Sequence, residues 1–352
     1  MTTFIQLHFL TAYAPSNLNR DDAGRPKTAI MGGVERLRVS SQSLKRVWRT
    51  SDNFEAAMAG HMGKRTQRIG VDYVYDPMIK AGVSPKVAKT SAEKIAAVFG
   101  KVKSDKNPKD ERKNFETEQI IHVSQHEINL IHQLVATLIA DNRDPTEDEL
   151  KLLRKEQRSV DMALFGRMLA SSPEFGVEAA CQVSHALGVS AVTVEDDFFT
   201  AVDDLNKDED TGSAHMGEQG FASALFYTYI CISRDLLIEN LGGDETLAKR
   251  AIAALTETAL TVSPTGKQNS YASRAYASYA LAEIGSRQPR SLAAAFFRPV
   301  RAVDQIGAAI QELEAQRDNF DRVYGKCEQS KTLNVADNSA ASLEELLAFV
   351  SQ

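Results

Sequence analysis

Strand-like and helix-like segments alternate along this chain of 352 residues in an order that leaves few possible folds. Residues 4–11 alternate apolar and polar side chains, which is the pattern of a strand with one buried face. We expect strands to return at 160–168, 221–232 and 270–281, with helices between them at 174–187 and 243–261. A strand–helix–strand order that occurs twice predicts an α+β fold of the ferredoxin-like or RNA-recognition type.

A second region, residues 54–157, has a helical pattern and interrupts the α+β part, which comprises 1–53 and 158–352. Apolar residues recur at helical spacing over 128–138. A capping sequence at 144–147 predicts the start of a further helix. We therefore expect a helical insertion in the α+β fold.

Composition limits where the chain acts and which groups it holds. Its apolar runs, such as 293–297, are much shorter than the roughly 18 residues that span a bilayer. Residues 1–4 lack the pattern of a secretory signal, so we expect a cytoplasmic protein with no membrane partner. Cys181, Cys231 and Cys327 are widely spaced, which is typical of neither a disulfide framework nor a zinc site. We expect no metal and no cofactor.

The charge pattern restricts any nucleic-acid site to a local patch. The formal net charge is −6, which argues against a protein that coats nucleic acid over its whole surface. Between Arg20 and Arg49, however, eight basic residues stand against three acidic ones. This window is the expected cationic patch.

The segment 38–49 is the most informative part of that window. A helix capped by Ser40 or Ser41 would place Gln42, Lys45 and Arg49 on one face, beside backbone N–H groups of the first turn that favour anions. This arrangement suits a chain of phosphates. The alternative is an amphipathic helix whose basic face only meets water.

Four segments carry a resemblance to a known family. They include SNLNRDD at 16–22, running on to Arg49, then LFGRM at 164–168, DFFTAVDDL to GSAHMG within 197–217, and GKQNSY at 266–271. In sequence, order and spacing they resemble the CasC-type backbone subunit of the type I-E CRISPR surveillance complex, Cascade. The resemblance covers roughly half of the chain and excludes 54–157 and the C-terminal tail.

The resemblance implies an RNA-recognition-like palm, a helical finger domain and a protruding thumb hairpin at about 195–220. It also implies a non-catalytic subunit that oligomerises along a guide RNA (crRNA) and presents its bases for pairing with target DNA in antiviral defence. The implied partners are guide RNA, target DNA, further copies of the chain and other subunits of the complex.

By the same resemblance, a set of polar residues contacts phosphates or sugars of the guide. Such contacts fix the register without reading sequence, which leaves the bases free for pairing. The implied residues are Arg20, Lys27, Ser40, Gln42, Lys45, Arg46, Arg49, Arg167, Lys267 and Gln268.

The thumb is expected to unstack one nucleotide of the guide with an apolar wedge, as inserted side chains do in kinked nucleic acids. The alternative is that its phenylalanines hold the hairpin on the core. Two methionines, Met168 and Met216, either pack at the same kink or fill gaps in the core. The wedge residues are Phe198, Phe199, Thr200 and Val202.

Two other functions compete with guide binding. A distant resemblance to backbone subunits of RNA-targeting complexes implies a metal-dependent, guide-directed RNA nuclease that would use Asp21 or Asp22, in the loop after the first strand. Adjacent aspartates in a strand point to opposite faces, so pairs such as Asp196-Asp197 offer at most one ligand each. The third hypothesis is a scaffold that oligomerises without nucleic acid.

A further basic stripe is expected on the helix that begins near Pro145. The spacing i, i+3, i+4, i+7 would give it one face suited to a non-specific grip on target DNA. A solvated face balanced by nearby glutamates explains the same pattern equally well. The stripe consists of Lys151, Arg154, Lys155 and Arg158.

Overall fold

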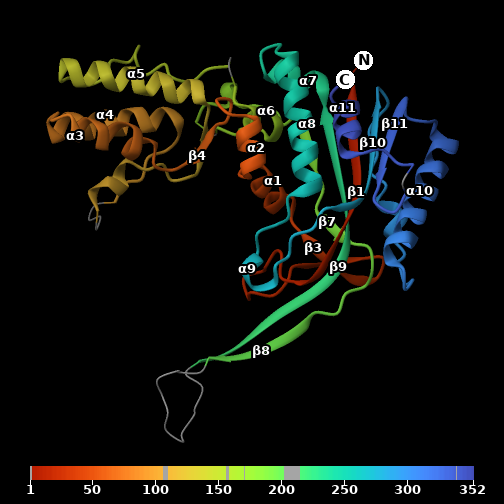
Figure 1. Ribbon diagram of the computed structural model, residues 1–352. Helices are drawn as coiled ribbons and strands as arrows, with labels where there is room; N and C mark the ends of the chain where they lie inside the picture. The colour runs from red at the N-terminus through yellow and green to blue at the C-terminus, as the bar shows by residue number, and fades with distance from the viewer. Residues whose placement is uncertain (1, 106–109, 156–157, 170, 202–214, 338) are drawn as a thin grey trace, which may run out of the picture. The chain divides into compact units, whose positions relative to one another are not determined.

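The chain forms two compact units (Figure 1). The sheet unit comprises Met1–Glu55, Gln182–Ser233 and Ile252–Gln352, and the helical unit comprises Ala56–Cys181 and Arg234–Ala251. The helical unit therefore extends beyond 157 and takes in a second segment that the sequence did not indicate. The computed structural model describes residues 2–105, 110–155, 158–169, 171–201, 215–337 and 339–352.

Four antiparallel strands form the centre of the sheet unit. They are β1 (Phe4–Ser16), β7 (Ala186–Gly188), β9 (His215–Ser233) and β10 (Ala277–Gly285). Their spatial order is β10-β1-β9-β7, so β1 lies between β10 and β9. The expected strands at 4–11 and 221–232 lie within β1 and β9, and both predictions are confirmed.

The helices between these strands complete the predicted fold class. Helix α1 (Ser41–Arg49) follows β1 in the chain before β7, and α8 (Glu245–Thr261) connects β9 with β10. Two strand–helix–strand units with the strand order 4-1-3-2 form the split arrangement of ferredoxin-like and RNA-recognition folds. The predicted α+β class is confirmed, as is the helix expected at 243–261.

Further elements extend the sheet and cover it. Strand β11 continues the sheet beyond β10, and β3 and β2 continue it beyond β7. Strand β8 pairs with the first part of β9 to form a hairpin. The bounds are β2 Thr28–Met31, β3 Val34–Val39, β6 Cys181–Val183, β8 Glu195–Ala201, β11 Gln329–Asn334, α2 Asp52–Ala57, α9 Gln268–Tyr271, η4 Ala293–Phe296, α10 Gln305–Tyr324 and α11 Leu343–Val350.

The sheet is buried on both faces. On one face, α10 and η4 pack through Ile310, Leu313 and Phe296 against Leu10 of β1. On the other face, Leu44 and Trp48 of α1 are buried. Strand β1 therefore differs from the half-buried strand predicted at 4–11, because its polar residues are also buried.

The buried polar side of β1 is satisfied by a network around His8, which is fully buried. His8 Nδ1 lies 2.9 Å from the Tyr227 hydroxyl, and its Nε2 lies 3.4 Å from the Glu283 carboxylate. Glu283 in turn accepts two hydrogen bonds from Arg290, at 3.0 and 3.1 Å. A polar strand face can therefore be buried here because its side chains contact one another, although His8 Nε2 makes only the long contact with Glu283 and no hydrogen bond.

The helical unit has its own core, in which α4 and α5 pack with a short π-helix. The apolar stripe predicted at 128–138 is confirmed, since Ile128, Ile131, Val135 and Leu138 are buried along α5. The bounds are β4 Lys64–Thr66, η1 Val71–Tyr75, α3 Asp76–Lys80, α4 Pro85–Phe99, η2 Glu111–Phe115, β5 Ile121–Val123, α5 Gln125–Asp141, α6 Val160–Phe165, η3 Pro173–Phe175 and α7 Arg234–Asn240.

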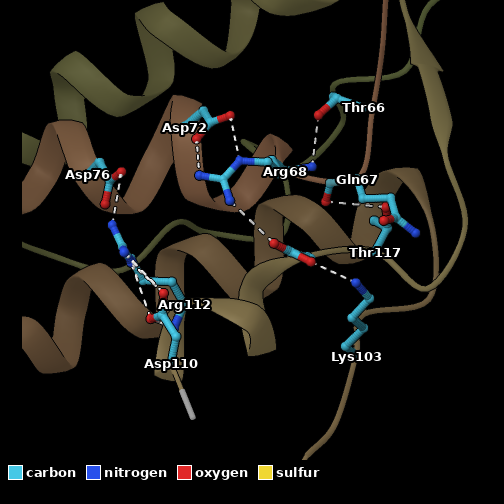
Figure 2. Close-up of polar contacts among 10 residues, drawn as sticks. Thr66, Gln67, Arg68, Asp72, Asp76, Lys103, Asp110, Arg112 and Thr117 are labelled. Atoms are coloured by element: carbon cyan, nitrogen blue, oxygen red, sulfur yellow. Dashed lines mark hydrogen bonds and ion pairs between the residues drawn. The ribbon is translucent and has the colours of Figure 1, made fainter. Parts of the chain in front are cut away.

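Ion pairs fasten the segment after α4 to the π-helix region, as Figure 2 shows. Arg68 contacts Asp72 at 2.7 Å and Glu116 at 3.4 Å, and Glu116 also accepts from Lys103 at 2.6 Å. Each pair is at least partly exposed, so each contributes little alone. Together they hold a charged segment against the surface of the unit.

Several element predictions are wrong. Residues 160–165 form helix α6 rather than a strand, because every side chain of Val160–Leu164 is buried and such a short apolar run does not discriminate strand from helix. The helix expected at 174–187 is a 3-10 turn followed by the short strands β6 and β7. The strand expected from 270 begins at Ala277, after α9 and a left-handed Ala272.

The helix expected to begin near Pro145 does not form. Glu149 accepts from Arg143 and from the Thr146 backbone N–H, which closes a turn. Leu152 and Leu153 are then buried side by side in irregular backbone. The stripe predicted at 151–158 therefore does not lie on one helix face.

Arg167 requires a second correction. Its side chain lies in the interior of the helical unit, where the guanidinium donates to the Glu127 carboxylate at 2.8 and 2.9 Å and to the Phe175 carbonyl at 3.0 Å. Both members of the ion pair are 1% exposed. Because these donors are used within the unit, Arg167 does not fit the predicted contact with phosphate. The adjacent Met168 is 91% exposed.

Among the helices of the described residues, none combines the length and apolar character of a membrane crossing.

The burial of His8 makes stability depend on pH. Burial lowers the pKa of His8 below its ordinary value of 6.5, although Glu283 opposes this shift. The folded state therefore binds the proton less readily than the unfolded chain, and stability falls as the pH drops below about 6.5. We expect the urea midpoint of unfolding to decrease on acidification, and to decrease less in His8→Gln. His185, whose pKa is also lowered by burial, remains in the variant as a common background. Equal decreases in both proteins would contradict this role of His8.

The buried pair predicts a large effect of Arg167→Ala. Removing one partner leaves the Glu127 carboxylate buried without its cation, which costs about 3–5 kcal/mol. Urea unfolding of the full chain measures this loss. Lys155→Ala, at an exposed position of the same unit, is the matched control and should change stability by less than about 0.5 kcal/mol. If Arg167→Ala were as stable as wild type but bound RNA more weakly, Arg167 would be an RNA contact, as predicted from the sequence.

Candidate nucleic-acid interface

The loop that follows β1 is fixed by one buried amide. Asn17 is fully buried, and its side-chain nitrogen donates to the carbonyls of Gly24 at 3.0 Å and Gly220 at 2.9 Å. Arg25 of the loop pairs with Asp196 of β8 at 2.7 Å. The loop is thereby held against the base of the β8–β9 hairpin.

A close backbone approach brings a distant segment to the same place. A Cβ atom on Gly266 would lie 2.2 Å from the Leu18 carbonyl oxygen, so glycine is required there. Lys267 follows in the left-handed conformation. The Tyr271 hydroxyl, three residues after Gln268, accepts a hydrogen bond from Gln219 of β9. Segment 266–271 therefore lies beside both the loop and the hairpin base.

Helix α1 begins as predicted, with Ser40 as its cap, whose hydroxyl accepts from the Ser43 N–H at 3.3 Å. The Ser41 N–H donates to Nδ1 of His185 at 2.9 Å. The N–H groups of Ser41 and Ser43 therefore have partners within the protein, so the expectation that first-turn N–H groups face an anion is wrong for these two residues. Buried Leu44 and Trp48 set the orientation of the helix and place its polar positions away from the core.

The pKa of His185 depends on the charges near the start of α1. Its pKa is lowered by burial and further by the positive charges of Arg38 and Lys27. A neutral imidazole is also what allows Nδ1 to accept from Ser41. Among the described residues, neither Arg38 nor Lys27 takes part in an ion pair. The site therefore has positive charge that a bound anion would neutralise.

Nine of the predicted RNA contacts lie in the sheet unit, on the loop, on α1 and its cap, and on segment 266–271. Arg20 and Arg46 are exposed, and Lys27 is half-buried. Arg46 and Gln268 line the same groove although they are far apart in the sequence. The nine residues are Arg20, Lys27, Ser40, Gln42, Lys45, Arg46, Arg49, Lys267 and Gln268. Arg167 and Met168 belong to the helical unit.

The β8–β9 hairpin extends from the sheet (Figure 1) and presents its aromatic residues to solvent. Phe198 is 64% exposed, Phe199 43% and Met216 65%, so the alternative that both phenylalanines hold the hairpin on the core is not supported. Phe198 and Thr200 point to one face, and Phe199 points to the other. The ring of Phe199 lies against Gly217. A Cβ atom added to Gly217 would be 2.5 Å from that ring. Val202 lies outside the described residues.

The residues of the predicted DNA-binding stripe have separate partners. Lys151 pairs with Asp148 at 2.7 Å, and Arg154 donates to the Lys151 carbonyl at 2.6 Å. Lys155 lies over the Phe175 ring at 5.9 Å, and Arg158 donates to Asn240 at 2.7 Å. Each of the four side chains therefore has a contact within the helical unit, and the four do not share a helix face.

Two of the acidic residues near the loop, Asp21 and Asp196, are engaged by Arg25. The Asp21 carboxylate accepts from the Arg25 N–H at 2.9 Å, and Asp196 is paired with Arg25. Within the part of the chain that the structure describes, no three His, Cys, Asp or Glu residues are grouped as metal ligands.

Sequence reasoning missed several residues of this surface. Asn17 and His185 act through contacts made far along the chain, and nothing in their own segments indicates these contacts. Arg274 and the 73% exposed Tyr276 line the groove that holds Arg46 and Gln268. Both residues lie shortly after the GKQNSY segment at 266–271. Their closeness to that segment is the sequence signal that could have indicated them.

Comparison with solved structures gives two similar chains of full length. One belongs to a CRISPR RNA-guided surveillance complex described as pre-nicking, with 29% sequence identity, a TM-score of 0.85, and coverage of 99% of this chain and 100% of that chain. The other, from a CRISPR RNA-guided surveillance complex, has 24% identity and a TM-score of 0.74, covers 98% of this chain and 99% of that chain, and supports the fold alone. A comparison with curated protein sequences gave no significant match.

A family model extends this result to the sequence. The model of the CT1975-like protein family, Cas_CT1975, matches residues 5–349, which is nearly the whole chain. The predicted resemblance to a subunit of a Cascade-type CRISPR surveillance complex is confirmed. The chain belongs to the CT1975-like protein family.

Proposed function

We propose that this protein is a backbone subunit that binds guide RNA in a CRISPR surveillance complex. One observation carries the proposal: three segments, one of them more than 200 residues from the other two, meet at one end of the sheet and carry the cationic residues there. These segments are the loop at 17–27, helix α1, whose cap Ser40 donates its N–H to Asn19 at 2.9 Å, and the stretch 266–271. The similarity to a chain of an RNA-guided complex supports the same function.

The chemistry of the surface suits a guide of any sequence. Arginine, lysine, glutamine and serine side chains contact phosphates and sugars, and such contacts fix register without reading bases. The positive charge is local, since the chain as a whole has a net charge of −6. The bases of the guide therefore remain free to pair with target DNA, and further copies of the chain bind successive segments of the guide.

We propose in addition that the subunit is not a nuclease. Asp21 and Asp196 are engaged by Arg25, and two-metal cleavage requires carboxylates that share a pair of metal ions about 3.5–4 Å apart. The guide should therefore be recovered at full length from binding reactions that contain magnesium. Cleavage that disappears in Asp21→Ala or Asp22→Ala would establish the nuclease alternative.

Replacing Lys45 and Arg49 together with alanine should weaken guide binding for every spacer sequence. Charge-assisted contacts contribute about 1.5–3 kcal/mol each, so the loss of two should lower affinity at least about 100-fold. The slope of log K against log salt should decrease by roughly 1.4, because each phosphate contact on a single strand contributes about 0.7. Fluorescence anisotropy with several guides at several salt concentrations measures both quantities.

The matched control for this double variant is Arg322→Ala with Lys326→Ala, two exposed cations at the other end of the same unit's sequence. It should leave the salt slope unchanged. If Lys45→Ala/Arg49→Ala affected some spacers and spared others, these residues would read bases. If the wild-type chain bound no RNA, the scaffold hypothesis would replace the proposal.

The exposed hairpin predicts periodic distortion of the guide. If Phe198 and Phe199 insert between bases, guide nucleotides in the assembled complex should show chemical reactivity at regular intervals, and mismatches there should barely weaken target binding. Phe198→Ser with Phe199→Ser should flatten this periodicity, whereas Asp197→Asn on the same hairpin should preserve it. Uniform reactivity along the wild-type guide would refute the wedge.

A further inference from the structure

A polar groove lies beside α1 in the sheet unit, apart from the face that carries Lys45 and Arg49. Its volume is about 930 Å³. One wall is the C-terminal half of α1 with the turn after it, and the other wall is the stretch 261–276, which includes α9. The residues that matter for its chemistry are Arg46, Asp52, Gln268, Arg274 and Tyr276.

The α1 wall is held in place by short-range hydrogen bonds. The hydroxyl of Thr50 donates to the Arg46 carbonyl at 2.9 Å, and the hydroxyl of Ser51 donates to the Trp48 carbonyl at 2.8 Å. Trp48 itself is 1% exposed and anchors this end of the helix in the core. The backbone that carries Arg46 is therefore fixed before any ligand binds.

The opposite wall is fixed by a single buried serine. The Ser263 hydroxyl accepts from the Ala275 N–H at 2.8 Å and donates to the Ala275 carbonyl at 3.1 Å. A left-handed residue, Ala272, turns the chain just before this point. Arg274 and Tyr276 flank the pinned residue, so their backbone positions are set as well.

The side chains of the groove combine free positive charge with an exposed aromatic ring. Arg46 and Arg274 are both exposed, and no ion pair among the described residues includes either guanidinium. Asp52 is the one acidic residue among those that line the groove. The Tyr276 side chain is 73% exposed, although the next residue, Ala277, begins strand β10 and is buried.

We propose that this groove binds one unpaired nucleotide of a single strand. The base stacks on the Tyr276 ring, and the adjoining phosphate lies between Arg46 and Arg274. Aromatic rings that hold bases beside cations that hold phosphates are the usual means of gripping single strands without sequence preference. The groove has the size of an ordinary small-ligand site, about 300–1,000 Å³.

The inference rests on the proposed function and adds a base-holding subsite to it. The face of α1 that carries Lys45 and Arg49 contacts only phosphates of the guide, whereas the groove binds a base as well. RNA and DNA share this chemistry, so the strand that occupies the groove is distinguished by experiment. A nucleotide held there would be withdrawn from pairing.

The test uses the full chain with fluorescent 12-nucleotide RNA and DNA single strands, in anisotropy titrations over a range of salt. Tyr276→Ala should weaken binding about 5- to 100-fold, whereas Tyr276→Phe, which retains the ring, should bind like wild type. Arg274→Ala should lower the salt slope by about 0.7. Both side chains are exposed, and equal urea midpoints confirm that the variants are folded.

A strand of the same length with abasic sites identifies the stacking contact. Wild type should bind this strand more weakly than the intact one, and Tyr276→Ala should cause no further loss. A larger loss with RNA than with DNA assigns the groove to the guide, and the reverse assigns it to the target strand. Tyr276→Phe behaving like Tyr276→Ala would overturn stacking, and efficient competition by polyglutamate would indicate an acidic peptide instead.

These outcomes separate the subsite from the function on which it rests. If Lys45→Ala/Arg49→Ala weakens RNA binding while Arg274→Ala and Tyr276→Ala bind like wild type, the subsite is refuted and guide binding stands. If the wild-type chain binds neither strand, both proposals fail.

Discussion

The pairing of β1 with two neighbours along its length is the constraint on which the sheet unit depends. Phe4 to Leu10 pair with β9 on one side and with β10 on the other, so the first strand of the chain is the inner strand of the sheet. Both faces of β1 are then covered, and its polar residues must find partners inside the protein. The His8–Glu283–Arg290 network meets that requirement. Where β1 ends at Ser16, the chain leaves the sheet directly into the loop of the candidate interface.

The interface shows how an acidic protein can present a cationic surface. Its positive residues come from segments that are brought together by short contacts, such as the Asn17 amide with the Gly220 carbonyl and Gly266 with the Leu18 carbonyl. Burial lowers the pKa of His185 at the start of α1, and the positive charges of Arg38 and Lys27 lower it further. Because fields of this kind fall off within about 10 Å in salt, the net charge of −6 elsewhere does not cancel them.

Local signals in the sequence predicted part of this structure and long-range contacts determined the rest. The cap at Ser40, the stripe of α5 and the helix at 245–261 are encoded within a few residues, and they were predicted. Residues 160–165 were misassigned because a buried apolar run has no periodicity to read. Arg167 was misassigned because its partner, Glu127, lies 40 residues away and removes it from the surface. The groove was missed because its two walls are more than 200 residues apart.

The hairpin differs from the rest of the interface in its charge, and this restricts what it can contact. Its strands carry Glu195, Asp197 and Glu218, which repel phosphates, between exposed phenylalanines. An isolated two-stranded hairpin is only marginally stable in water, and exposed aromatic rings add no burial to stabilise it. Contacts with the apolar faces of bases would cover the rings while keeping the carboxylates away from the backbone. Under the proposed function, the cationic end of the sheet would therefore hold phosphates, and the acidic hairpin would contact bases.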